Sequence, residues 1–256
     1  MGNNYISMRA SDNSIVKIEY HERVESSISL MREYAQDMSF PDRYAVLSKY
    51  DYTYGSDSQG LHLSLLLRPS LFPAQAGLLK ALATVALAKA LEEHTEKHIG
   101  IGWVGKIYCD GKQIGGVNIE GKLDNFTTYE YIIVNFAVKL SNENFPPRLT
   151  DLIKKVFEED NNSIAMIIAK NILNKFFPYY QKMKSSTKFM QEYHQRFILS
   201  GIKVKLIEDG RKTSCKILSV SRENCALIVE ARDKSIRYIT SPASVIIPKT
   251  VKLSKK

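Results

Sequence analysis

The sequence predicts an α+β protein: a mixed sheet with packed helices over residues 1–199, followed by a small, basic β-barrel over residues 200–256. Two observations predict this division. As far as residue 199, long alternating runs typical of strands are interspersed with apolar periods typical of helices. After Gly201 the apolar runs become short and alternate, and turn sequences such as Glu208-Asp-Gly210 separate them. We therefore expect two domains, with the helices of the first on one side of its sheet.

Capping residues and prolines mark where the elements of the first domain begin and end. Ser26-Ser27 precedes an apolar period, as the N-cap of a helix does. Pro69 and Pro146 each follow a strand. The expected strands are 14–20, 44–48, 60–68, 101–109, 114–119 and 129–140, the expected helices are 27–37, 74–98, 150–159, 163–177 and 187–197, and the expected barrel strands are 202–207, 214–220, 226–230 and 237–240.

The segment from Ile101 to Glu120 carries the first indication of a binding site. Asp110-Gly111 is a two-residue hairpin turn between two strands. Gly115 and Gly116 then stand next to each other inside the second strand, where glycine is costly unless something must lie close to the backbone. The pair therefore predicts a ligand-binding sheet, and a β-bulge without a ligand is the alternative.

Composition narrows the class of protein. The apolar run 74–91 is interrupted by Gln75, Lys80 and Lys89, so we expect a buried helix and no membrane segment. The first residues contain no apolar signal-peptide core. Three widely spaced cysteines without a C-x-x-C pair indicate the reducing cytoplasm, with no disulfide framework and no zinc site. His94 and His98 are expected on a solvated helix face and not around a metal.

Positive charge is concentrated at the C-terminal end. Residues 200–256 hold 13 Lys/Arg and 5 Asp/Glu, a charge of +8, out of +9 for the whole chain. Such a module suits an acidic partner surface, although ordinary solubility charge explains it equally well. Tyr238 is the only aromatic residue of this segment, which argues against single-stranded nucleic acid as the partner.

Five motifs, in the right order, resemble those of the biotin protein ligases. They cover most of the chain. Their counterparts in that family are D-S-T-N, W-x-S-P-x-G-G-L-Y-x-S, I-K-W-P-N-D-I-Y, G-K-K-I-G-G-I-L-x-E and I-G-I-G-I-N. In this sequence they are Val24–Ser27, Tyr54–Ser64, Ile101–Tyr108, Gly111–Glu120 and Ile133–Lys139.

The resemblance implies an enzyme that uses ATP to activate biotin and then attaches it to a lysine of a carrier domain. Biotin and ATP would be the ligands, with no structural metal, and an acidic biotin-carrier domain would be the partner. The C-terminal segment would be an SH3-like β-barrel, and a homodimer is left open. The ligand-binding residues that the resemblance implies are Ser26, Ser27, Asp51, Tyr54, Trp103, Gly115 and Gly116.

The departures from the family fall on the charged groups of its site. The family carries a G-R-G-R-x-G-R loop, but here only Tyr52 and Thr53 stand between Asp51 and Tyr54. Every arginine of that loop is therefore missing. Asp51 itself stands where the family has a glutamine near biotin. Gln113 stands where the family has the second lysine of G-K-K, and a glutamine carries no charge.

Further departures concern the residues that, in the family, lie near the nucleotide. Val104-Gly105-Lys106 replaces the family's P-N-D, and Gly102 replaces the lysine before the tryptophan. In the I-G-I-G-I-N strand, Lys139 replaces the asparagine, and Asn135 and Ala137 replace the glycines. No catalytic residue is therefore assigned with confidence from the sequence.

Three functions are compatible with this pattern. The first is a ligase homologue that is impaired or inactive, because each lost charge contact is worth roughly 10²-fold in rate or more. The second is a working acyl ligase or transferase whose site is rebuilt with Lys106, Lys112 or Lys139. Strand alternation places Lys112 on the face opposite Gln113, which argues against Lys112. The third is a non-enzymatic interaction module that docks an acidic partner through the basic barrel.

Overall fold

The large sheet contains eight strands and is mixed, as predicted. The computed structural model describes residues 5–54, 59–95, 97–124, 127–139, 162–184, 188–208 and 210–252. The strand order is β1-β2-β3-β4-β8-β7-β6-β5, and only the β2–β3 pair is parallel. The strands are β1 Tyr5–Arg9, β2 Ile15–Val24, β3 Tyr44–Asp51, β4 Gln59–Leu67, β5 Ile99–Gly102, β6 Lys106–Cys109, β7 Lys112–Leu123 and β8 Tyr129–Lys139.

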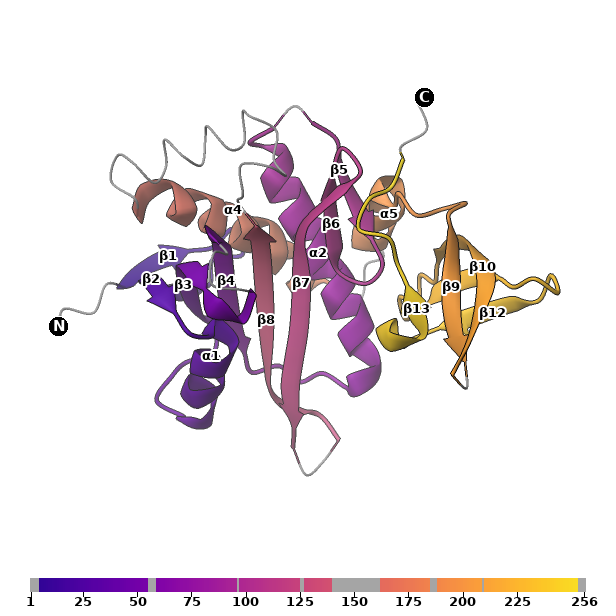
Figure 1. The fold of residues 1–256 in the computed structure, drawn as a ribbon. Coiled ribbons are helices and arrows are strands. Elements are labelled where there is room, and N and C mark those ends of the chain that lie inside the picture. Colours follow the sequence, from indigo (N-terminus) through magenta and orange to yellow (C-terminus); the bar gives the residue numbers. More distant parts are fainter. Residues whose placement is uncertain are drawn as a thin grey trace.

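Helices cover both faces of this sheet (Figure 1). Alternation along β3 shows why: Ala45 and Leu47 belong to the main apolar core, whereas Tyr44 and Val46 pack in a second cluster with Met31 of α1 (Ser27–Gln36). The expectation of helices on one side was therefore wrong for α1. The helices α2 (Ala76–Glu92), α4 (Asn162–Gln181) and α5 (Lys188–Arg196) pack on the opposite face of the sheet, where the main core lies.

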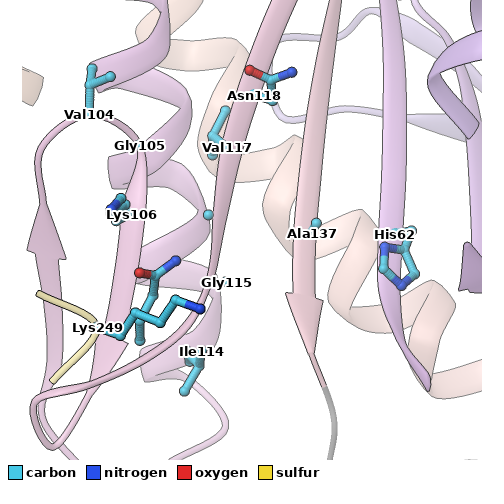
Figure 2. Close-up of a pocket in the computed structure, with 12 residues that line it drawn as sticks. His62, Val104, Gly105, Lys106, Ile114, Gly115, Val117, Asn118, Ala137 and Lys249 are labelled. Carbon is cyan, nitrogen blue, oxygen red and sulfur yellow. The ribbon is translucent and has the colours of Figure 1, made fainter. Parts of the chain in front are cut away.

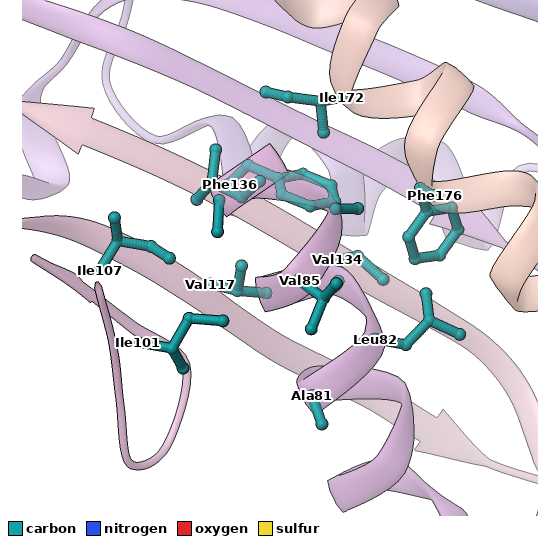
Figure 3. Packing of buried hydrophobic residues seen from close by; sticks show 14 of the residues in the cluster. Ala81, Leu82, Val85, Ile101, Ile107, Val117, Val134, Phe136, Ile172 and Phe176 are labelled. Atoms are coloured by element: carbon teal, nitrogen blue, oxygen red, sulfur yellow. The ribbon is translucent and has the colours of Figure 1, made fainter. Parts of the chain in front are cut away.

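Helix α2 is the centre of the main core. Figure 3 shows Leu82 and Val85 of this helix packed with Val134 and Phe136 of β8. Among the described residues, Pro73–Glu92 is long and apolar enough to span a membrane, but 61% of its most apolar window is buried inside the protein. Its packing is that of a core helix, because strands and helices surround it.

Several expected boundaries were wrong. The single strand expected at 101–109 is an antiparallel hairpin of β5 and β6, because the chain turns at 103–105, where Gly105 has a φ of +80°. Helix α2 ends at Glu92, so His94 and His98 lie beyond it and not on a helix face. Strand β1 was not expected. The expected helix 150–159 lies outside the described residues.

The C-terminal segment forms a second, five-stranded antiparallel sheet. Its order is β12-β11-β10-β9-β13, so β12 and β13 are edges and the pairing describes an open sheet. An all-β module after residue 200 is thus present, whereas closure into an SH3-like barrel stays a prediction. The strands are β9 Lys203–Glu208, β10 Arg211–Val220, β11 Leu227–Glu230, β12 Ile236–Ile239 and the unexpected β13 Val245–Ile246.

The two sheets are tied together by buried contacts. The indole N–H of Trp103 donates a hydrogen bond to Cys225 O at 2.8 Å, and Tyr108 Oη donates to Pro248 O at 2.8 Å. Apolar side chains of both sheets belong to one continuous core. The division into domains 1–199 and 200–256 therefore stays a prediction.

Candidate functional site

A cavity of about 400 Å³ lies over strand β7 at the glycine pair. Figure 2 shows the lining residues, which come from β4, the β5–β6 turn, β6, β7, β8 and the C-terminal tail. They are His62, Val104, Gly105, Lys106, Gln113, Ile114, Gly115, Gly116, Val117, Asn118, Ala137 and Lys249. An apolar floor with a few polar groups is typical of a site for a small molecule.

The glycine pair is required by the protein's own backbone. A Cβ placed on Gly115 would lie 2.1 Å from Ala137 O, and a Cβ on Gly116 would lie 2.3 Å from Gly105 O. The group that approaches these glycines is therefore backbone of β8 and of the β5–β6 turn. A ligand is therefore not needed to explain the pair, although the pair does line the cavity.

The alternative that a β-bulge explains the pair also holds in part. Ile107 pairs with Gly115 and Tyr108 pairs with Gln113, which leaves Ile114 as the extra residue of β7. A bulge re-aims the neighbouring side chains. Here it accompanies a hollow surface, since Gln113, Ile114 and Gly115 all line the cavity.

The cavity is positively charged. Two lysines line it, Lys106 from β6 and Lys249 from the C-terminal tail, and none of its lining residues in the described part of the chain is Asp or Glu. Burial lowers the pKa of Lys106, and the nearby Lys249 lowers it further. Gln113 Oε1 is buried and has no hydrogen-bond partner among the described residues.

A buried polar network lies beside the cavity, between α1 and the sheet. Ser27 donates its backbone N–H to Asp51 Oδ2 at 2.9 Å and its hydroxyl to the same oxygen. Ser64 Oγ donates to Ser27 Oγ at 3.0 Å, and Asn135 Nδ2 donates to Ser64 Oγ at 2.8 Å. Burial alone would raise the pKa of Asp51, but hydrogen bonds from Ser27 and Thr53 outweigh it and lower that pKa.

Strand register places the network one step from the cavity. Asn135 of β8 pairs with Ser64 on one side and with Asn118 on the other. The next residue on the same face of β8, Ala137, pairs with His62 and Gly116, which line the cavity. The network therefore fixes the wall of the cavity at its α1 end.

No family model matches the chain, and no curated protein matches it in sequence. Solved structures do. A variant of the biotin protein ligase from Aquifex aeolicus in complex with biotin superposes with a TM-score of 0.68 at 19% identity, over 90% of this chain and 97% of that one. The same ligase in complex with biotin and ATP gives 0.64 at 20% identity, with the same coverage. A biotin protein ligase-like protein of unknown function from Silicibacter sp. gives 0.61 at 16% identity, over 88% and 94%.

The chain has the biotin protein ligase fold. The likeness spans most of the length of each protein. The expectation of this fold is therefore confirmed.

Within the ligase fold, only some of the expected site residues face the cavity. Gly115, Gly116, Gln113 and Lys106 line it. Lys112 does not: its side chain is exposed, and its backbone bridges the C-terminal tail at Thr250. The ligand roles of Gly115 and Gly116 stay predictions.

The other expected ligand-binding residues do not line the cavity. Ser27 and Asp51 are fully buried in the polar network, and Ser26 caps α1 by accepting the Ser29 N–H at 3.2 Å. Trp103 is buried against the second sheet. The side chains of Tyr54 and Lys139 lie outside the described part of the chain.

Sequence reasoning missed three polar lining residues, Lys249, Asn118 and His62. A signal existed for His62, because it stands where the family motif W-x-S-P-x-G-G-L-Y-x-S has its tyrosine. Lys249 had no local signal, since its place depends on how the tail returns to β7. Within the described ranges, no cluster of three or more His, Cys, Asp or Glu residues could hold a metal ion.

Replacing Asp51 with asparagine is expected to lower the free energy of unfolding by about 2 kcal/mol near neutral pH. An amide cannot accept from both Ser27 and Thr53, as the carboxylate does. Because the folded-state pKa is below the ordinary 3.8, this stabilisation is full above 3.8 and is lost as pH falls through the lowered value. Urea unfolding at pH values above and below 3.8 measures the effect, with exposed Asp110→Asn as the control. An equal loss at both pH values contradicts the carboxylate's role.

Proposed function

We propose that this chain is a biotin ligase-like protein that binds biotin in the β7 cavity but forms the biotinyl adenylate slowly or not at all. The observation that carries the proposal is the cavity itself, which lies in a ligase fold and offers an anionic ligand two lysines and, among its described lining residues, no carboxylate. Solved relatives of this fold contain biotin, or biotin and ATP.

The lining suits biotin. Val104, Ile114, Val117 and Ala137 supply apolar contacts, and Gln113 supplies an uncharged polar side chain. The volume of about 400 Å³ lies within the range of small-molecule sites. The lysines would meet the carboxylate, which is the only charge that biotin carries.

The adenylation step is where the site is weak. Attack of a carboxylate on the α-phosphate of ATP releases pyrophosphate and brings two anions together, so fixed cations and N–H donors must meet the charge. The sequence lacks every arginine of the family's loop, and Gln113 carries no charge. Asn135, which replaces a family glycine, fills space at the α1 end of the site.

An active acyl ligase with a rebuilt site is the second candidate. Lys106 lines the cavity, and Lys249 adds a cation that the family comparison did not anticipate. Either lysine could stabilise a phosphate.

The third candidate is docking through the basic second sheet. Lys203 and Lys205 of β9 are exposed, whereas Val204 and Leu206 between and beside them are buried, so one face of this strand is basic. An acidic biotin-carrier domain in the cytoplasm is the partner that we propose for it, and a homodimer is left open. Nucleic acid fits this surface less well, because Tyr238 is its only aromatic residue.

Biotin-dependent exchange of labelled pyrophosphate into ATP tests the proposal. We expect calorimetric binding of biotin without exchange at an ordinary ligase rate. Gln113→Lys is expected to raise exchange, because it places a cation where the family has one, and Gln113→Met is the uncharged control. Vigorous exchange by the unmodified protein would refute the impairment, and Lys106, Lys112 and Lys139 would then be mutated first. Absence of biotin binding would refute the binding function.

A further inference from the structure

The C-terminal tail returns to the large sheet and is held there on both sides of Lys249. Tyr108 Oη donates to Pro248 O at 2.8 Å, and the Gln113 N–H donates to Lys249 O at 2.9 Å. Beyond Lys249, the Val251 N–H donates to Gly111 O at 2.7 Å, and the Val251 side chain is buried. The backbone of Lys249 is therefore fixed beside the residue that replaces the family lysine.

The Lys249 side chain extends along the cavity toward Gly115, while Lys106 enters from β6 (Figure 2). In the described part of the chain, neither ammonium group has a carboxylate within ion-pair distance, and neither has a further partner left undescribed. The pKa of Lys106 is lowered mainly by burial and to a smaller extent by the positive charge of Lys249. The two cations therefore repel each other. An anion bound between them would relieve that repulsion.

We propose that Lys106 and Lys249 form a two-cation site for the anionic group of the cavity's ligand, a carboxylate or a phosphate, and that the C-terminal tail supplies the cation lost at Gln113. This inference deepens the proposed function and rests on it for the choice of biotin as a probe. The site is incomplete without the tail, because Lys249 is, within the described ranges, the only lining residue that comes from beyond strand β8.

Two lysines suit this role better than one. A lysine ammonium is a compact point charge with three donors, so two of them can share the oxygens of one carboxylate or phosphate. The amide of Gln113 lies next to Lys249 and can take part without charge. The arrangement predicts recognition of an anion with no need for the missing arginines.

Calorimetric titration at low ionic strength tests the inference with two probes, biotin and inorganic pyrophosphate. Lys249→Ala and Lys106→Ala are each expected to weaken the binding of at least one probe about tenfold, as loss of a charged hydrogen bond does. Lys249→Gln keeps most of the length of the side chain but not its charge, and should behave like the alanine variant. Lys252→Ala is the matched control, because Lys252 is exposed on the same tail and does not line the cavity. Thermal unfolding of each variant verifies that the tail is still in place.

The outcomes separate the two claims. Weaker biotin binding in the Lys249 and Lys106 variants assigns the pair to a carboxylate, weaker pyrophosphate binding assigns it to a phosphate, and either supports the inference. If the protein binds pyrophosphate through both lysines but does not bind biotin, the inference stands and the proposed function fails. If biotin binds and Lys249→Ala matches Lys252→Ala with both probes, the inference is overturned while the proposed function stands. If only pyrophosphate binds and the two variants match, both claims fail. Binding of neither probe overturns both.

Discussion

Replacing Trp103 with alanine is expected to lower the free energy of unfolding by about 3–5 kcal/mol, the usual cost of deleting a buried aromatic side chain. Trp103 is only 1% exposed, in the turn between β5 and β6. Its indole N–H reaches across to Cys225 O at 2.8 Å, in the segment between β10 and β11. The truncation therefore removes apolar contact and leaves a buried carbonyl without its donor. Urea unfolding followed by far-UV circular dichroism measures the loss.

Trp103→Phe separates packing from hydrogen bonding. Phenylalanine keeps part of the apolar volume but lacks the N–H, so its loss should be clearly smaller than that of alanine. Because Trp103 ties the large sheet to the second one, Trp103→Ala also tests the domain division at residue 200. Two separate unfolding transitions in the variant would support two domains. A loss below about 1 kcal/mol would contradict the structural role of the indole.

The strands that were predicted well are those in which side chains alternate between two different environments. In β8, Ile133 packs on the α1 side and Val134 in the main core, and that alternation is visible in the sequence. Strand β13 has two residues, too few to show a period. The β5–β6 hairpin was missed because β-forming residues such as Ile101 and Ile107 stand on both sides of Gly105, and only the positive φ there reveals the turn.

The residues of the candidate site likewise fall into those that a local sequence pattern reveals and those that it does not. Gly115 and Gly116 were found because their cost is local to one strand. Lys249 was not found, because it reaches the cavity through tail contacts with Tyr108 and Gly111, which are distant in sequence. Local patterns therefore locate one strand of the site but not the groups that other elements bring to it.

Asn135 shows where a motif comparison reaches its limit. The sequence identified it as a side chain at a family glycine, but not what it contacts. In the structure its amide donates to Ser64 Oγ and to Ser27 Oγ, and so joins Ser27 and Asp51 in an internal network. One substitution in β8 thus changes the surroundings of two residues that the resemblance assigned to ligand binding.

Replacing Gly115 with alanine is expected to lower the free energy of unfolding by about 3 kcal/mol, at the upper end of the cost of overpacking. The added Cβ would lie 2.1 Å from Ala137 O and 2.8 Å from Val138 Cα. Both atoms are backbone of β8, which is hydrogen-bonded to β7 on one side and to β4 on the other. The strand cannot move away without breaking pairs in the middle of the sheet, so the clash persists as strain. Thermal and urea unfolding measure the loss.

Gly210→Ala is the matched control. Gly210 has a φ of +73° and nothing within 4 Å of an added Cβ, so alanine there meets conformational strain of about 1–2 kcal/mol but no clash. Gly115 adjoins the β-bulge but has no positive φ, so alanine there meets a clash but no such strain. A larger loss at Gly115 than at Gly210 shows that close backbone approach fixes the glycine of β7. Equal losses, or a Gly115→Ala protein as stable as the parent, would mean that β8 can yield and that the glycine serves the cavity instead.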